Sequence, residues 1–485
     1  MNELAEVFSQ FERSKIPKIE YMENLSYTPE EPIAAIATAL SPAALGIIRT
    51  SGKGCIEKVA EIFSRPKALK EAAGNTIVYG WISDGKEKID EVLVSVFRSP
   101  KSSTGEDMAE ITCHGGPVVV TAIYNALLRH GFRQAERGEF TFRGYINGKT
   151  DLTKAEAIKE IIDSRTDTSR SRAAGRLAGS LFTEIDSVKK LIIDTLAAVE
   201  VEIEYPEDEE TIADAYDTKD LEEAVRRLDS LAKSWKTEKL YQDGVRVVLC
   251  GRTNAGKSSL FNALLKEERA IVSDIEGTTR DWIESWVSFD GVPARLFDTA
   301  GLRETDDVIE ARGVEMTREL SGDADIILYL VDSSDGLKAE DEAFLTHAKN
   351  AYDVPLILVW NKIDKLGSEV FKAKTDIIDE KSQVQICAKT GFGIDSLSHL
   401  VKEKLSLLSS LDRSTAALGS ERQKNDVNEA LERIKHALEA TKAGYALDAA
   451  VQDMEDALDS LGAITGEVTS EDVLDSIFSH FCVGK

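Results

Sequence analysis

The sequence has 485 residues, of which 42% are hydrophobic, and its 59 Lys and Arg residues stand against 86 Asp and Glu, a formal net charge of -27. This length suffices for roughly three folded domains, and the negative charge argues against a broad electrostatic hold on nucleic acid or anionic membrane, so any RNA contact must be local. The five cysteines are scattered and form no Cys-x-x-Cys pair, which argues against a disulfide framework or zinc site and suits a reducing cytoplasm.

The first predicted domain follows an acidic N-terminal extension, residues 1–32, and spans residues 33–146. Its uncharged run at 32–48 contains two prolines and is too short to cross a membrane, so we expect a cytoplasmic protein without membrane contact. Short apolar runs alternate with a helical stretch, an α+β pattern. The predicted strands are 33–38, 46–49, 90–97 and 109–114, and the predicted helix is 118–130.

Three clusters in this domain contain charged residues next to glycine or to the end of a predicted strand. They are residues 46–49, 103–110 and 138–143. Taken alone, each is more typical of surface turns and helix caps than of a binding site. His114 stands before two glycines without a second ligand at metal-binding spacing, which favours a core or turn histidine over a metal ligand.

Long amphipathic helices are predicted in two separate segments, 147–243 and 409–485. The helical runs are 152–164, 181–202, 421–441 and 447–461, and a final helix starts near Thr469. The acidic stretch 204–223 is predicted to be a solvated loop or a linker before the next helix. The economical architecture is one helical domain in two sequence pieces with a further domain inserted between them; the alternative is two independent helical units.

The inserted segment, 244–408, alternates apolar strands with helices, which predicts a doubly wound, mainly parallel sheet with its ligand at the strand C-terminal ends. The predicted strands are 246–250, 294–297, 326–331, 356–360 and 384–387. Asp290-Gly291 lies between 285–289 and 293–297 and predicts a hairpin that adds an antiparallel edge strand.

A phosphate-binding loop is predicted at residues 251–258, which fit the pattern Gly, four residues, Gly-Lys-Ser without a mismatch and lie between a strand and a helix. Its backbone N–H groups and the helix N-terminus favour phosphate oxygens, Lys257 neutralises phosphate charge, and the Ser258 hydroxyl can ligate Mg²⁺.

Further motifs at strand ends select guanine. Asp298-Thr299-Ala300-Gly301 is a switch-type arrangement of P-loop NTPases. Asp364, in Asn-Lys-Ile-Asp at 361–364, can accept hydrogen bonds from the ring N–H and exocyclic amine of guanine, which adenine lacks in that arrangement. The predicted GTP contacts are Asn254, Ala255, Gly256, Lys257, Ser258, Ser259, Ser273, Asp274, Ile275, Glu276, Gly277, Thr278, Thr279, Asp298, Thr299, Ala300, Gly301, Asn361, Lys362, Asp364, Cys387, Ala388 and Lys389.

The residue after Asp-Thr-Ala-Gly is Leu302, where Ras-like proteins typically carry a water-orienting glutamine. We therefore expect another residue to orient the water. Thr279, between Ser273 and Asp281, is a second candidate Mg²⁺ ligand.

From about Ile33 to its last residue, the sequence resembles the bacterial and organellar tRNA modification GTPase family MnmE, also called TrmE. The motifs that carry the resemblance are 138–141 (Gly-Glu-Phe-Thr), 147–149, 151–152, 155–157, 254–259, 277–281 (Gly-Thr-Thr-Arg-Asp), 298–304 and the terminal Phe-Cys-Val-Gly-Lys of 481–485. It implies an N-terminal folate-binding domain that dimerises, a helical domain in two pieces, and an inserted GTPase domain.

The resemblance also implies site residues. Potassium would be held by the Asn254 side chain and by the backbone around Ser273, Ile275 and Thr278. Magnesium would take Ser258 and Thr279. The catalytic glutamate that orients water falls on Glu310, with Glu304 as the competing position and a solvated helix charge as the alternative.

The one-carbon folate site of the family maps onto Arg49, Glu110, Lys149 and Lys485. Glu106 is the alternative position for the glutamate of this site. Cys482 beside it is either a reactive thiol or a small buried side chain. Departures from the family pattern are Arg137, residues 142–145 and Ser273, together with the extension.

The implied function is a potassium-activated GTPase that works as a homodimer with the FAD-dependent partner MnmG, also called GidA, in a heterotetramer or larger complex. It would place an aminomethyl or carboxymethylaminomethyl group on the wobble uridine of certain tRNAs, with carbon from 5-formyl or methylene tetrahydrofolate. The rivals are a GTPase ribosome-assembly factor and a nucleotide-gated scaffold that barely hydrolyses GTP.

Overall fold

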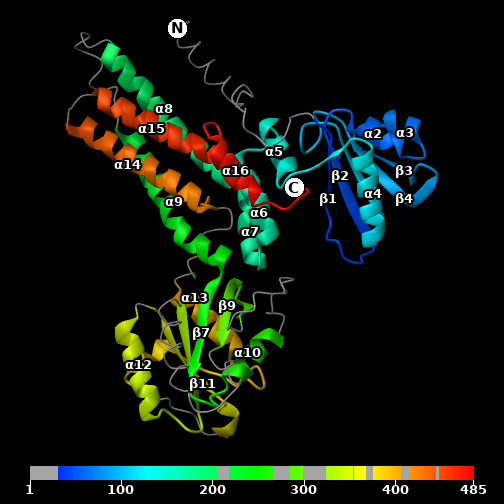
Figure 1. Ribbon diagram of the computed structural model, residues 1–485. Helices are drawn as coiled ribbons and strands as arrows, with labels where there is room; N and C mark the ends of the chain where they lie inside the picture. Colours follow the sequence, from blue (N-terminus) through cyan, green and yellow to red (C-terminus); the bar gives the residue numbers. More distant parts are fainter. Residues whose placement is uncertain are drawn as a thin grey trace. The chain divides into compact units, whose positions relative to one another are not determined.

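The computed structural model describes residues 31–204, 218–266, 284–298, 324–352, 354–366, 375–405, 416–443 and 447–485 (Figure 1). Two compact units divide the chain. The first comprises residues up to 159 together with 181–229 and 422–485, and the second comprises 160–180 and 230–421. Among the described residues, no helix is long and apolar enough to cross a membrane.

The first unit contains a six-stranded sheet in the order β3-β4-β5-β2-β1-β6, antiparallel except where β1 meets β6. Helix α4 (Pro117–Arg129) packs Ile123 and Leu127 into its core, and α2 (Cys55–Glu61) and α3 (Pro66–Lys70) complete this part. The α+β expectation is confirmed, although β3 was not predicted. The strands are β1 (Ile33–Ile36), β2 (Leu45–Ser51), β3 (Thr76–Asp84), β4 (Glu87–Phe97), β5 (Met108–His114) and β6 (Arg133–Gln134).

Gly138 caps a helix, as the helix-cap expectation for residues 138–143 requires, but the expectation that these residues form a surface turn is wrong. These residues open helix α5 (Glu139–Ile146), where Glu139 and Arg143 are each 1% exposed. Arg143 donates through Nη2 to Glu139 Oε1 at 2.9 Å and through Nη1 to Glu106 Oε2 at 3.0 Å, while Arg133 Nη2 lies 2.6 Å from Glu139 Oε1. Alternating opposite charges allow this network to be buried, because each ion keeps a charged hydrogen-bond partner.

The two helical segments belong to one helical domain. Arg422, at the start of the second segment, donates to both oxygens of Glu156 in the first, at 3.2 and 3.1 Å. Arg433 and Asp453 join α14 to α15, which lie alongside each other in Figure 1. The alternative of two independent helical units is therefore wrong. The helices are α6 (Leu152–Asp163), α8 (Ser180–Glu204), α9 (Lys219–Asp243), α14 (Glu421–Ala443), α15 (Leu447–Thr465) and α16 (Glu471–Ser479).

The second unit contains a sheet in the order β12-β11-β10-β7-β9-β8, parallel except for the edge strand β8. Asp290 and Gly291 take the positive φ angles 50° and 83° between β8 and β9, which confirms the predicted hairpin. The strands are β7 (Val245–Gly251), β8 (Glu284–Phe289), β9 (Val292–Asp298), β10 (Ile326–Asp332), β11 (Leu356–Asn361) and β12 (Gln383–Gln385), the last ending two residues before its predicted end.

Helices cover both faces of this sheet. Apolar side chains of α10 (Lys257–Lys266) and α13 (Ile394–Lys404) share one core, and those of α12 (Ala339–Ala351) belong to the core on the opposite face. Helix α7 (Asp167–Leu177) belongs to the same unit. The doubly wound architecture is confirmed. It places the loops after β7, β10 and β11 at one edge of the sheet.

Candidate functional site

The phosphate-binding loop connects β7 to α10 as predicted. Gly251 ends the strand with a φ of 132°, and α10 begins at Lys257. The buried Lys257 ammonium donates to the carbonyl oxygens of Gly251 at 2.6 Å and Arg252 at 3.0 Å, so it lies against the loop. The start of α10 therefore presents its first-turn N–H groups and a lysine at the same place, which suits the phosphates of a nucleotide.

Asn361 ties this loop to the predicted base pocket. Its side chain is 1% exposed, its Nδ2 donates to the Ala255 carbonyl at 2.9 Å, and its Oδ1 accepts from the Ala388 N–H at 3.0 Å. A Cβ on Gly256 would lie 2.1 Å from Asn361 Nδ2, so only glycine fits beside this amide. One side chain thus fixes the relative positions of two loops that come from β7 and β12.

The residues predicted to recognise the base lie after β11 and after β12. Asp364 is exposed and accepts a hydrogen bond from the Cys387 thiol at 3.2 Å. Ala388 is buried and Lys389 is exposed. The structure therefore brings Asn361, Asp364 and Cys387 together at one end of the sheet, and the exposed Asp364 carboxylate can receive the N–H donors of guanine.

Asp332 is a residue that the sequence interpretation missed. It ends β10 opposite Asn361 in the register of β11, and its Oδ2 accepts from Lys362 Nζ at 2.8 Å. Burial raises the pKa of Asp332, but the hydrogen bonds from Lys362 and Ser334 lower it by a larger amount. The pKa of Asp332 is therefore below its ordinary value, and the carboxylate is charged. A signal was available, because Asp332 follows an apolar strand as Asp298 and Asn361 do.

Several predicted residues lie outside the described ranges. They are the segment Ser273, Asp274, Ile275, Glu276, Gly277, Thr278 and Thr279, the residues Thr299, Ala300 and Gly301, and both Glu304 and Glu310. Asp298 ends β9 with its backbone opposite Leu249 of β7, next to the phosphate-binding loop. Residues 1–30, which make up most of the N-terminal extension, also lie outside the described ranges.

A second cluster forms in the first unit, where Arg49 and Glu110 face each other across β2 and β5. Arg49 Nε donates to Glu110 Oε1 at 2.8 Å, and its Nη1 donates to the carbonyl of Gly484 at 3.1 Å. Phe140 N donates to the carbonyl of Lys485 at 3.1 Å, so the C-terminal tail is bound at this cluster. Two of the four predicted folate positions, Arg49 and Glu110, therefore meet beside the backbone of the tail that carries a third, Lys485.

Lys149, the fourth folate position, donates to the Pro100 carbonyl at 2.7 Å. Glu106, the residue that could be confused with Glu110, instead pairs with the buried Arg143 and accepts from Ser51 at 2.7 Å. Glu110 is thus the carboxylate at the tail. Cys482 is exposed, so the alternative of a small buried side chain is wrong.

His114 pairs with a carboxylate. Its Nδ1 lies 2.8 Å from Asp90 Oδ1, and no group of metal-ligating side chains is found in the described part of the chain. The hydrogen bond and charge of Asp90 raise the pKa of His114 above 6.5. Its contribution to stability is therefore fully present below the unfolded-state pKa and is lost as pH rises through the folded-state pKa.

We therefore expect an NMR titration to give His114 a midpoint above 6.5, the ordinary value for histidine. In Asp90→Asn the midpoint should fall, because the carboxylate that favours the charged ring is gone. Equal midpoints in the two proteins would contradict this assignment.

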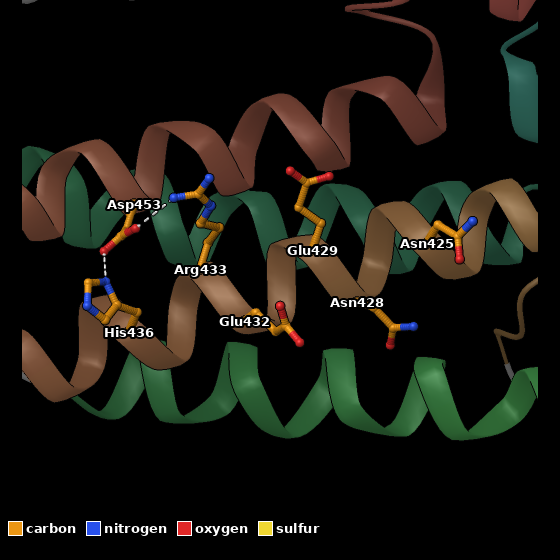
Figure 2. Close-up of a pocket in the computed structure, with 7 residues that line it drawn as sticks. All are labelled: Asn425, Asn428, Glu429, Glu432, Arg433, His436 and Asp453. Atoms are coloured by element: carbon orange, nitrogen blue, oxygen red, sulfur yellow. Dashed lines mark hydrogen bonds and ion pairs between the residues drawn. The ribbon is translucent and has the colours of Figure 1, made fainter.

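A groove of about 600 Å³ lies on the helical domain, lined by Asn425, Asn428, Glu429, Glu432, Arg433, His436 and Asp453. Figure 2 shows that Asp453 already pairs with His436 and Arg433. None of the predicted site residues lines this groove, so we do not assign the function to it.

Comparisons with known proteins identify the family. A model of the MnmE helical domain matches residues 152–482, and a model of the GTP-binding protein TrmE N-terminus matches residues 32–149. The tRNA modification GTPase MnmE of Treponema denticola is 51% identical over 471 residues, which cover 95% of this chain and 99% of that protein.

The MnmE of Treponema pallidum is 44% identical, and the match covers 95% of this chain and 99% of that protein. The MnmE of Carboxydothermus hydrogenoformans is 41% identical, and the match covers 94% of this chain and 100% of that protein. Identity at this level over nearly the full length of each protein establishes the family. The chain therefore belongs to the MnmE family of tRNA modification GTPases, which are GTP-hydrolysing enzymes.

Proposed function

We propose that this chain is a potassium-activated GTPase that works with the FAD-dependent partner MnmG (GidA) to modify carbon 5 of the wobble uridine in certain tRNAs. The added aminomethyl or carboxymethylaminomethyl group would draw its one-carbon unit from 5-formyl or methylene tetrahydrofolate. The observation that carries the proposal is that a single chain holds a guanine-type nucleotide site and, separately, an Arg49–Glu110 pair at which its own C-terminus is bound.

In the described part of the nucleotide site, Ser258 and Asn254 are the proposed ligands of Mg²⁺ and K⁺. Ser258 lies in the first turn of α10, as a Mg²⁺ ligand requires, and Thr279 would be the second protein ligand. The exposed Asn254 side chain would hold K⁺ together with the backbone of Ser273, Ile275 and Thr278. When bound, K⁺ would supply positive charge beside the phosphates, the electrostatic role of an arginine finger elsewhere. Glu310 would orient the attacking water.

The Arg49–Glu110 cluster fits a folate by its donor set. The Arg49 and Glu110 side chains are 23% and 24% exposed, so both are sheltered yet open to a ligand. A carboxylate suits the donor-rich edge of a pterin, and Lys149 and Lys485 suit the anionic tail. The exposed Cys482 lies three residues before the chain end, and its carbonyl accepts from the N–H of Gly138 at 3.4 Å.

We further propose the organisation that the family resemblance implies. The limits are an extension at 1–32, a folate-binding dimerisation domain at 33–146, a helical domain at 147–243 and 409–485, and a GTPase domain at 244–408. The chain would act in the cytoplasm as a homodimer within a heterotetramer or larger complex with MnmG.

The direct test is reconstitution. Purified chain, MnmG, FAD, GTP, K⁺, methylene tetrahydrofolate and unmodified tRNA should yield a modified wobble uridine by nucleoside mass spectrometry. A matched reaction without folate should not. If GTP is consumed and the uridine stays unchanged in the complete mixture, the modification role fails and the ribosome-assembly alternative gains.

The folate site has its own prediction. Glu110→Gln should weaken binding of 5-formyl tetrahydrofolate roughly tenfold to a hundredfold, because it removes the negative charge and replaces one acceptor oxygen with an NH₂ group that only donates. Isothermal titration measures this directly. Glu87→Gln, an exposed position on β4, is the control and should bind as the unaltered chain does. Equal affinities for all three proteins would remove Glu110 from the site.

A further inference from the structure

Two residues of the nucleotide site have unusual backbone conformations. Asn254 and Lys362 have φ angles of 65° and 63°, and only four residues other than glycine have positive φ in the described part of the chain. Such conformations cost free energy and persist where the surroundings hold them. The two residues are joined to each other, because Lys362 Nζ donates to the carbonyl of Asn254.

Asp332 holds the lysine that makes this link. Its side chain is 12% exposed, its Oδ2 lies 2.8 Å from Lys362 Nζ, and Lys365 Nζ lies farther away at 3.5 Å. Its Oδ1 accepts from the backbone N–H of Ser334 at 3.0 Å and from the Ser334 hydroxyl at 2.6 Å. Both oxygens therefore have fixed roles, one toward its own loop and one toward Lys362.

We propose that Asp332 is a positioning residue for the nucleotide site, which fixes the Lys362 ammonium so that it holds the Asn254 carbonyl and with it the conformation of the phosphate-binding loop. The link runs from the end of β10 through the base-recognition motif to the loop. Asp332 itself need not touch the nucleotide. The inference rests on the proposed nucleotide site and extends it to a residue that its motifs do not include.

The chemistry favours this role over a general charge effect. Lys362 carries three N–H donors, and the carboxylate and the carbonyl receive two of them in fixed directions. A charge-assisted hydrogen bond is stronger than a neutral one and is directional. Without the carboxylate, the ammonium is free to leave the loop for solvent, and Asn254 loses the contact that fixes its left-handed conformation.

The test compares Asp332→Asn with Asp332→Ala in the full chain. Asparagine keeps the size of the side chain, but with its oxygen toward Ser334 its NH₂ group faces the lysine, so donor meets donor. We expect GDP to dissociate about tenfold faster from both variants, as loss of a charged hydrogen bond predicts, while kcat at saturating GTP and the unfolding temperature are retained. The K⁺ concentration for half-maximal turnover should rise in parallel.

Two controls separate positioning from charge. Asp335→Asn alters an exposed carboxylate in the same turn, and Lys365→Gln removes the second lysine near Asp332 without changing Lys362. Both should release GDP at the unaltered rate. An unaltered rate in Asp332→Asn, an equal rise in Lys365→Gln, or unfolding of both Asp332 variants would overturn the positioning role. Absence of K⁺ stimulation in the unaltered chain would count against the proposed function alone, because GDP release is measured separately.

Discussion

Asn361→Ala is expected to weaken GTP binding by roughly a hundredfold, the largest loss that we expect from any single buried side chain of the nucleotide site. The side chain is the shared partner of the Ala255 carbonyl and the Ala388 N–H. Alanine leaves both backbone groups without this partner, and each unsatisfied buried group costs about 1–3 kcal/mol. The two loops then lose their common anchor, so the phosphate and base subsites are no longer held in register.

Equilibrium binding of a fluorescent GDP and GTP measures this loss. Asn350→Ala, at an exposed position on α12, is the matched control and should bind both nucleotides normally. The effect should fall on both nucleotides alike, because the anchor acts on the loops that both share. Unchanged affinity in Asn361→Ala would mean that the loops keep their geometry without the bridge.

Glu139→Ala is expected to lower the free energy of unfolding of the first unit by about 3–5 kcal/mol, since removing one partner of a buried ion pair leaves an uncompensated charge. Arg143 is 1% exposed and would keep only Glu106, while Arg133 would lose both oxygens of Glu139 and keep only the exposed Glu31. Helix α5 begins at Glu139, so the loss falls where the C-terminal tail is bound.

Denaturant unfolding, followed by a probe in the first unit, measures this difference. Glu136→Ala lies three residues earlier at an exposed position and should change the stability by less than about 0.5 kcal/mol, as surface substitutions usually do. A loss in Glu139→Ala no larger than in this control would show that the network contributes little.

Much of the nucleotide-binding unit could be predicted from the sequence. Its strands are short apolar runs, its motifs stand at strand ends, and Asp290-Gly291 needs positive φ angles that few other dipeptides supply. In the first unit, β3 was missed, because its exposed Ile77 and Tyr79 leave little of the alternation between apolar and polar residues that marks a half-buried strand.

The charge clusters show what a local pattern cannot reveal. Residues 138–143 resemble a solvated turn because isolated charges are seldom buried, yet Arg143 is buried by its contact with Glu106, 37 positions away. Likewise, Arg49 meets Gly484 across 435 positions. Such pairings come from the tertiary fold, so for Arg49, Glu110 and Lys485 only the family resemblance could suggest a common site.

GTP turnover by the purified chain in matched potassium and sodium buffers shows whether the GTPase depends on potassium. We expect marked stimulation by potassium that is lost in Asn254→Lys, because the ammonium would replace the ion and its Asn ligand. We also expect Glu310→Ala to lose hydrolysis and to keep nucleotide binding. Equal turnover in the two salts would contradict potassium activation.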